Sequence, residues 1–274
     1  MWPEPSLIVT LFDPGDAPVG ASGPTVRVRL TVAYDGHGFH GFAVNAGVRT
    51  VGGTLSNAIS RILGHPVRLT CAGRTDSGVH ATGQVVSFDA STERLDLAYL
   101  QRAVNRLCGP AIAVRDGIVT DSGFDARFSA TSRRYRYVVL NRQVPDPFVA
   151  STSWHVEQPL NLYALSLGCD ALLGEHDFSA FCRRPKSNDG RNPSLVRRVI
   201  DAGWTDDGAG LLRFEIEASS FCHQMVRSVV GTLVAMGSGR RKPGEMAGII
   251  RSRERQFATD LAPPQGLTLL AVRY

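Results

Sequence analysis

The sequence predicts an α+β protein built from two similar cycles of strands and helices. Short runs in which apolar and polar residues alternate are typical of strands with one buried face, and longer runs with apolar residues three or four apart are typical of helices. The 274 residues, 43% of them hydrophobic and 20% charged, suffice for one large domain or two halves of ordinary size. We therefore expect two α+β halves, each with its helices on one side of an antiparallel sheet.

The first half is expected at residues 25–125, after an N-terminal extension at residues 1–24. The extension is rich in Pro, Gly and Ala and shows no sustained period, so we expect it to be flexible. Asp96 is suited to cap the start of a helix, and Gly64 to end one. The predicted elements are strands at 26–34, 66–72, 83–90 and 112–119 and helices at 53–63 and 97–107.

The second half is expected at residues 126–274. In its last predicted helix, Phe221, Met225 and Val229 fall on one apolar stripe. Arg227 lies off this stripe, one turn after His223, so we expect it to point away from the core. The predicted elements are strands at 133–141, 196–204 and 211–218 and helices at 160–173 and 220–237.

The composition predicts where the protein is located, the state of its cysteines and whether it binds a metal. The chain has no apolar run long enough to span a membrane, and its first thirty residues carry acids and prolines in place of a leader, so we expect a cytoplasmic protein. The five cysteines lack C-x-x-C spacing, so we expect reduced, mostly buried thiols. No set of His, Cys, Asp and Glu has a recognised ligand spacing, and we expect no metal site.

The charge of the chain favours a polyanionic partner. The formal net charge is +5, and Lys186 and Lys242 are the only lysines among 30 basic residues. Arginine guanidinium groups match phosphates and stack on bases, which favours nucleic acid. A coding bias towards arginine would explain the same composition.

Residues 36–41, GHGFHG, satisfy the G-x-G-x-x-G pattern of dinucleotide-binding enzymes. In those enzymes the helix opens inside the glycine pattern, and an acid about twenty residues later holds the ribose. Here the next helical pattern starts a dozen residues later, and residues 36–75 contain no acid. A dinucleotide-dependent dehydrogenase is therefore a remote alternative.

The stretch AGRTDSGVH, residues 72–80, carries an isolated carboxylate, Asp76, between Gly73 and Gly78. The glycines permit close backbone approach, and Arg74 supplies a nearby cation that favours the ionised form. Such a carboxylate can act as a nucleophile or stabilise developing positive charge. The alternative is a turn residue that binds nearby backbone N–H groups.

Two further segments carry groups suited to nucleic acid. Tyr135 and Tyr137 alternate with arginines, which places the two rings on one face of a strand and the arginines on the other. Packing of that tyrosine face on the core is the alternative explanation. Residues 181–198 hold six basic residues against Asp189 and could contact phosphates.

Several long motifs, in order, resemble the TruA-type tRNA pseudouridine synthases. The resemblance covers residues 26–274, and the segment around Asp76 matches the catalytic-aspartate motif of that family almost letter for letter. The matching segments are YDGHGFHG (34–41), CAGRTDSGVHATGQVVSF (71–88), FDARFSATSRRYRY (124–137), LLGEHDFSAFC (172–182) and FCHQMVRSVVGTL (221–233).

The resemblance implies an isomerase that converts uridine to pseudouridine in the anticodon arm of tRNA, at positions 38–40, as a homodimer without cofactor or metal. It implies that Asp76 is the nucleophile and Arg227 its ion-pair partner. Tyr135 would stack on the target base and assist proton transfer, and Arg74 would help hold the base out of the helix. The implied fold has two similar α+β halves that share one extended antiparallel sheet, with helices on one side and a central catalytic cleft.

The chain departs from the family pattern at two places. Phe42-Ala43 stands where Trp-Gln is common, and Asp125 where histidine is frequent. These departures put details of RNA contact in doubt and leave the inferred chemistry intact. A catalytically silent RNA-binding protein on the same fold is the second alternative.

Overall fold

The computed structural model describes residues 23–184, 193–258 and 260–274. Nearly all of the expected N-terminal extension and the middle of the basic segment 181–198 lie outside these ranges. The first strand begins at Thr25, where the sequence predicts the start of the folded part.

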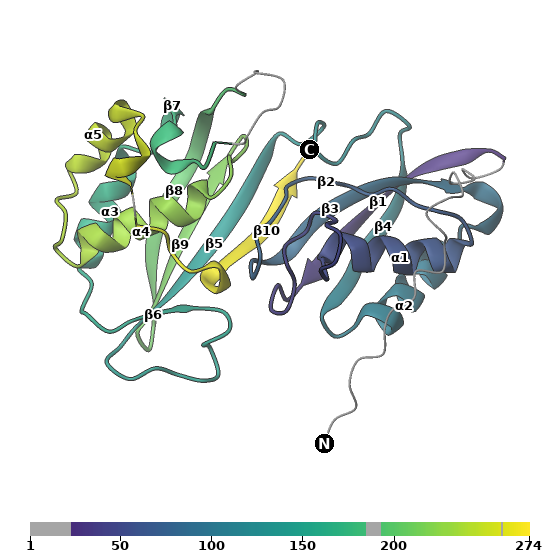
Figure 1. Cartoon of the computed structure of the whole chain (residues 1–274), viewed down its shortest axis with the longest axis horizontal. Coiled ribbons are helices and arrows are strands. Elements are labelled where there is room, and N and C mark those ends of the chain that lie inside the picture. The colour runs from purple at the N-terminus through teal and green to yellow at the C-terminus, as the bar shows by residue number, and fades with distance from the viewer. Residues whose placement is uncertain (1–22, 185–192, 259) are drawn as a thin grey trace.

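The strands in the described residues form one ten-stranded sheet (Figure 1). Its main path has the order β4-β1-β3-β10-β5-β9-β8-β7, while β2 pairs with β3 and β6 pairs with β5. The strands are β1 (Thr25–Tyr34), β2 (Thr70–Cys71), β3 (His80–Ser91), β4 (Ile112–Thr120), β5 (Ser132–Asn141), β6 (Trp154–Val156), β7 (Gly174–Asp177), β8 (Val196–Gly208), β9 (Leu211–Ala218) and β10 (Leu267–Arg273).

The expectation of a purely antiparallel sheet is wrong at two pairs, β3 with β10 and β5 with β6. The last strand of the chain, β10, lies between the strands of the first half and those of the second (Figure 1). Its direction is set by its antiparallel pairing with β5, so it runs parallel to β3, over only two residue pairs. The sheet is therefore mixed, and β10 joins its two parts.

The first two helices begin and end within two residues of the predicted positions. The Thr50 and Asp96 side chains cap α1 and α2 by accepting hydrogen bonds from Gly53 and Tyr99 backbone N–H groups, and Gly64 ends α1 in the left-handed conformation. The α-helices are α1 (Val51–Leu63), α2 (Leu97–Cys108), α3 (Leu162–Asp170), α4 (Met225–Gly237) and α5 (Glu245–Ser252), with single 3₁₀ turns at Thr92–Arg94, Ser179–Phe181, Arg255–Phe257 and Pro264–Gly266. None of the described helices has the length and apolar content needed to cross a bilayer.

Alternating burial gives the sheet one covered face. In β1, Val28, Leu30 and Val32 are buried, as the alternating pattern predicts. In β5, Tyr135 and Tyr137 are buried, which confirms that the tyrosine face packs on the core. The mixed α+β class is confirmed, whereas the division into halves at residue 125 stays a prediction.

Two local expectations are wrong. The last long helix begins at Met225 instead of residue 220, because Gln224 has φ 67°, which interrupts the helix, so His223 lies in the preceding segment. Cys182 and Cys222 are paired as a disulfide, with their Cα atoms 5.8 Å apart, although we expected reduced thiols. Forty residues separate the two positions, and only the tertiary fold brings them together.

Candidate functional site

Asp76 lies in the loop between β2 and β3 and faces two nitrogen-bearing side chains from the second half of the chain. Its Oδ2 accepts a hydrogen bond from Nη1 of Arg227 at 3.1 Å, and its Oδ1 lies 3.4 Å from Nε2 of His223. The Asp76 side chain is 25% exposed, so solvent still reaches the carboxylate. The expected contact with Arg227 is present, and His223 adds a partner that we had not predicted for Asp76.

Arg227 is held in place from two sides. It lies in the first turn of α4, most of whose residues are buried, and its Nε donates to the Ala262 carbonyl at 2.8 Å. The Ala262 N–H in turn donates to the Arg227 carbonyl at 3.1 Å. Because one nitrogen is occupied by the backbone, Nη1 is directed at Asp76. The positive end of the α4 dipole also favours a carboxylate at this position.

Tyr135 contributes a neutral phenol next to this ion pair. The side chain is buried, and its ring meets that of Phe221 edge-on with centroids 5.0 Å apart. Burial, with smaller contributions from Tyr34 and the negative charge of Asp76, raises the pKa of Tyr135 well above its usual value. The phenol therefore keeps its proton at neutral pH and can donate it, while a phenolate is disfavoured.

Arg74 points to solvent. It is exposed, and among the described residues no carboxylate lies within ion-pair distance of it. Within the described ranges Arg74 forms no ion pair with Asp76, whose partners are Arg227 and His223. The Arg74 guanidinium is free to contact a ligand.

A buried polar side chain that we did not predict fixes the root of the Asp76 loop. Gln84 in β3 is fully buried; its Nε2 donates to the Gly73 carbonyl at 2.7 Å, and its Oε1 accepts from the Gly73 N–H at 3.4 Å. The Tyr34 and Thr75 hydroxyls lie 2.8 Å apart beside it. A glutamine inside an otherwise apolar strand pattern was the available signal, since buried amides need specific partners.

Two glycines of the GHGFHG stretch, Gly36 and Gly41, pack closely against the same loop. A Cβ on Gly36 would lie 2.2 Å from the Val79 carbonyl oxygen, and one on Gly41 would lie 2.8 Å from the Thr75 carbonyl oxygen. Gly41 also has φ +87°. These glycines are therefore explained by close packing on the Asp76 loop, without a dinucleotide.

The two departures from the family pattern have structural roles. Asp125 accepts hydrogen bonds from the backbone N–H groups of Arg127 and Phe128 at 2.8 and 2.9 Å, and so caps a turn. Phe42 is buried and packs near Tyr34, with ring centroids 6.1 Å apart.

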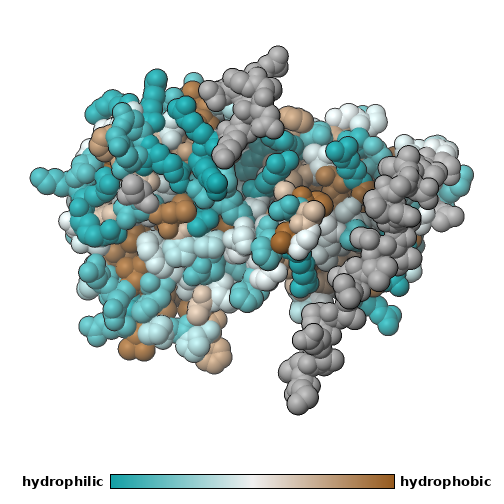
Figure 2. Space-filling view, viewed as in Figure 1, coloured by the Kyte–Doolittle hydropathy of each residue, from teal (hydrophilic) through white to brown (hydrophobic). Residues whose placement is uncertain are grey.

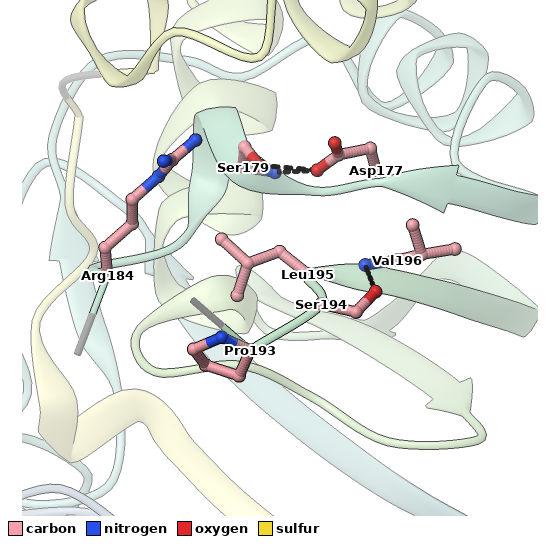
Figure 3. A pocket seen from close by; sticks show the side chains of 7 residues that line it. All are labelled: Asp177, Ser179, Arg184, Pro193, Ser194, Leu195 and Val196. Carbon is pink, nitrogen blue, oxygen red and sulfur yellow. Dashed lines mark hydrogen bonds between the residues drawn. The ribbon is translucent and has the colours of Figure 1, made fainter. Parts of the chain in front are cut away.

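The surface has a hollow of about 200 Å³ whose lining does not include Asp76 (Figure 3). The Asp177 carboxylate in its wall already accepts from the Ser179 N–H at 3.0 Å and pairs with Arg253 at 3.3 Å. Within the described ranges, no cluster of three or more His, Cys, Asp or Glu is arranged to hold a metal. Figure 2 shows a different recess, bordered by hydrophilic side chains, near the middle of the molecule where β5 and β10 lie in Figure 1.

Comparison with known proteins extends over most of the chain. A family model described as tRNA pseudouridine synthase matches residues 30–128 and 169–274. The tRNA pseudouridine synthase A of Leifsonia xyli subsp. xyli is 39% identical over 268 residues, covering 90% of this chain and 91% of that protein. The proteins of the same name from Frankia casuarinae and Dechloromonas aromatica are 40% and 42% identical, covering 91% and 88% of this chain and 89% and 90% of their own lengths.

Proposed function

This chain belongs to the tRNA pseudouridine synthase family, and from that premise we propose that it isomerises uridine to pseudouridine in tRNA with Asp76 as the nucleophile. The observation that carries the proposal is the contact between Asp76 and Arg227, at 3.1 Å on a partly exposed carboxylate. The guanidinium fixes the orientation of the carboxylate, which is the group that can attack as a nucleophile.

The site must support the breaking of one bond, the turning of the base and the formation of another bond. The bond between uracil N1 and ribose C1′ breaks, the base turns, and a bond from C5 to C1′ forms with loss of the C5 proton, while N1 takes up a proton. The base must therefore leave the stack and be confined while it is detached. Asp76 can add to uracil C6, bond to C1′, or remove the C2′ proton on a route through a glycal.

The other side chains of the site meet the remaining demands. Arg227 orients the Asp76 carboxylate through the 3.1 Å hydrogen bond. The protonated Tyr135 phenol supports the extruded pyrimidine and can donate a proton, and exposed Arg74 holds the vacated position in the RNA. Stacking and phosphate contacts offset the few kcal/mol that unstacking costs.

We further propose that the substrate segment is the anticodon stem-loop, at positions 38–40, and that the enzyme is a cytoplasmic homodimer. The family resemblance supports these assignments. On α3, Tyr163 and Leu167 lie one turn apart with 73% and 41% of their surfaces exposed, which provides an apolar face for a second copy. Sedimentation of the purified protein at a dimer mass, and mapping of pseudouridine in tRNA, test these points.

The test of the reaction is tritium release from tRNA labelled at uracil C5. Wild-type protein should release tritium, and Asp76→Asn, which keeps the shape of the side chain, should lower release by at least about 10³-fold. Asp116→Asn is the matched control, since Asp116 is an exposed acid on β4. Release that survives in Asp76→Asn would remove the nucleophile role.

Two other outcomes separate the alternatives. Tight tRNA binding without release by the wild type would indicate a silent RNA-binding protein. Saturable binding of NADH in a fluorescence titration would support the dehydrogenase.

A further inference from the structure

Arg133 is a buried guanidinium outside the set of residues assigned above. It lies on β5 two residues before Tyr135, so its side chain leaves the same face of the strand. The residue is 7% exposed, and burial lowers its pKa from the usual value. Arginine nevertheless stays protonated in proteins, so the fold holds a desolvated positive charge.

This charge is satisfied by backbone carbonyls. Nη2 donates to the Ala72 carbonyl at 2.9 Å and to the Arg127 carbonyl at 2.6 Å, and Nε also points to Ala72 at 3.3 Å. Nη1 donates to the carbonyls of Ala130 at 3.1 Å and Ser219 at 2.9 Å. Among the described residues, no carboxylate forms an ion pair with Arg133. Leaving such carbonyls or such a charge without partners would be costly, so the arrangement is strongly specified.

Two of the segments that bind Arg133 are followed in the chain by residues of the site. Ala72 comes directly before the loop that carries Arg74 and Asp76. Ser219 follows the end of β9 and begins the segment that leads to Arg227 in the first turn of α4. One rigid fork therefore connects the root of the Asp76 loop with the segment that precedes Arg227.

We propose that Arg133 is a positioning residue that sets the spacing between Asp76 and Arg227. This role rests on the proposed function. A lysine at position 133 keeps the charge but offers three N–H donors on a single nitrogen in place of five in a planar fork, so it cannot make the same five bonds.

The test is a double-mutant cycle between positions 133 and 227. Arg133→Met should lower kcat for tRNA by about 100-fold or more in the otherwise wild-type enzyme, with KM changed by less than about 3-fold. In an Arg227→Lys background, where the guanidinium partner is already gone, the same change should lower kcat by less than about 3-fold, because residues acting as a unit are not additive. A general structural role would give the same fold-loss in both backgrounds and would overturn the proposal.

Two further variants keep the test decisive if Arg133→Met folds poorly. Arg133→Ala should regain kcat when millimolar guanidinium is added and gain nothing from NaCl at the same ionic strength; equal effects of both salts would overturn the role.

Arg134→Met is the matched control, since Arg134 leaves the other face of β5 and pairs with Glu215 at 2.7 Å, and its kcat should stay within about 3-fold of wild type. Absence of tritium release by the wild type would overturn the proposed function and this role together, whereas additive losses in an active enzyme would overturn this role alone.

Discussion

The Asp76 carboxylate is defined by its neighbours more than by its own loop. Its guanidinium partner, Arg227, is 151 positions away in the sequence, while the arginine two positions away is turned to solvent. A carboxylate that is hydrogen-bonded to a guanidinium and partly exposed is held in place and still accessible to a substrate. These properties make Asp76, and no other carboxylate described above, suited to nucleophilic attack.

Gly41 offers a prediction at the same scale. Gly41→Ala should destabilise the protein by about 2–3 kcal/mol and lower kcat, because the added Cβ would lie 2.8 Å from the Thr75 carbonyl at a φ of +87°. Gly38→Ala is the matched control, since Gly38 has φ +75° and open space around its Cβ position. It should cost only about 1 kcal/mol and leave kcat unchanged. Urea denaturation and kcat measure both, and equal effects of the two variants would contradict the contact with the Asp76 loop.

At the scale of elements, β5 carries different chemistry on its two faces. Its tyrosine face packs on the core, and its Arg134 and Arg136 side chains each lie 2.7 Å from the Glu215 carboxylate on β9. These arginines are therefore neutralised within the sheet. Some of the arginines that favour a nucleic-acid partner in the sequence therefore form ion pairs within the sheet instead.

The Glu215 pairs predict a pH dependence of stability. Burial raises the pKa of Glu215, but the hydrogen bonds and charges of Arg136 and Arg134 outweigh it, so the folded pKa lies below the usual value. A depressed pKa contributes stability that is present above the unfolded pKa of about 4.3 and is lost as pH falls through the folded pKa. Glu215→Gln should therefore cost about 1 kcal/mol at pH 7, and this difference from wild type should shrink below about pH 4.

Urea denaturation of both proteins at pH 7 and at pH 3.5 measures this difference. Glu157→Gln, an exposed acid with no ion pair among the described residues, is the control and should show no such change. A difference that is the same at both pH values would show that the carboxylate charge is not what stabilises β5 against β9.

At the scale of the whole molecule, the first half of the chain carries exposed basic side chains. Arg49, Arg61, Arg68 and Arg74 belong to the acid-free stretch of the sequence, and all four are exposed. Arg49 also lies over the Phe39 ring, 4.4 Å from its centroid. Exposed arginines without carboxylate partners attract phosphates over the range of the Debye length.

Affinity for tRNA should fall steeply with salt, with a log–log slope of about −3 or steeper if four or more phosphates are contacted. Arg49→Ala should reduce the slope by about 0.7–0.9, because one phosphate contact is lost. Arg136→Ala should leave the slope unchanged, since its charge is compensated by Glu215. Filter binding over a salt series measures all three proteins, and a flat response would make the arginine-rich surface incidental.

The sequence by itself determined most of the elements and the central carboxylate. Strand alternation, helical spacing and the caps at Asp96 and Gly64 are local properties, so most of the predicted helices and strands are found, although β6, β7, β10 and α5 were not predicted. The isolated Asp76 and its flanking glycines were visible for the same reason, and the order of long motifs identified the family before any coordinates.

Only the tertiary structure decided which side chains meet. The contact of His223 with Asp76, the Arg133 fork, the Cys182–Cys222 pair and the central position of β10 all join segments far apart in the chain. Local patterns predict which face of a helix or strand is buried, but not which other element packs against that face. The physical reason is that such contacts depend on how whole elements pack, which the short-range periodicity of a sequence does not specify.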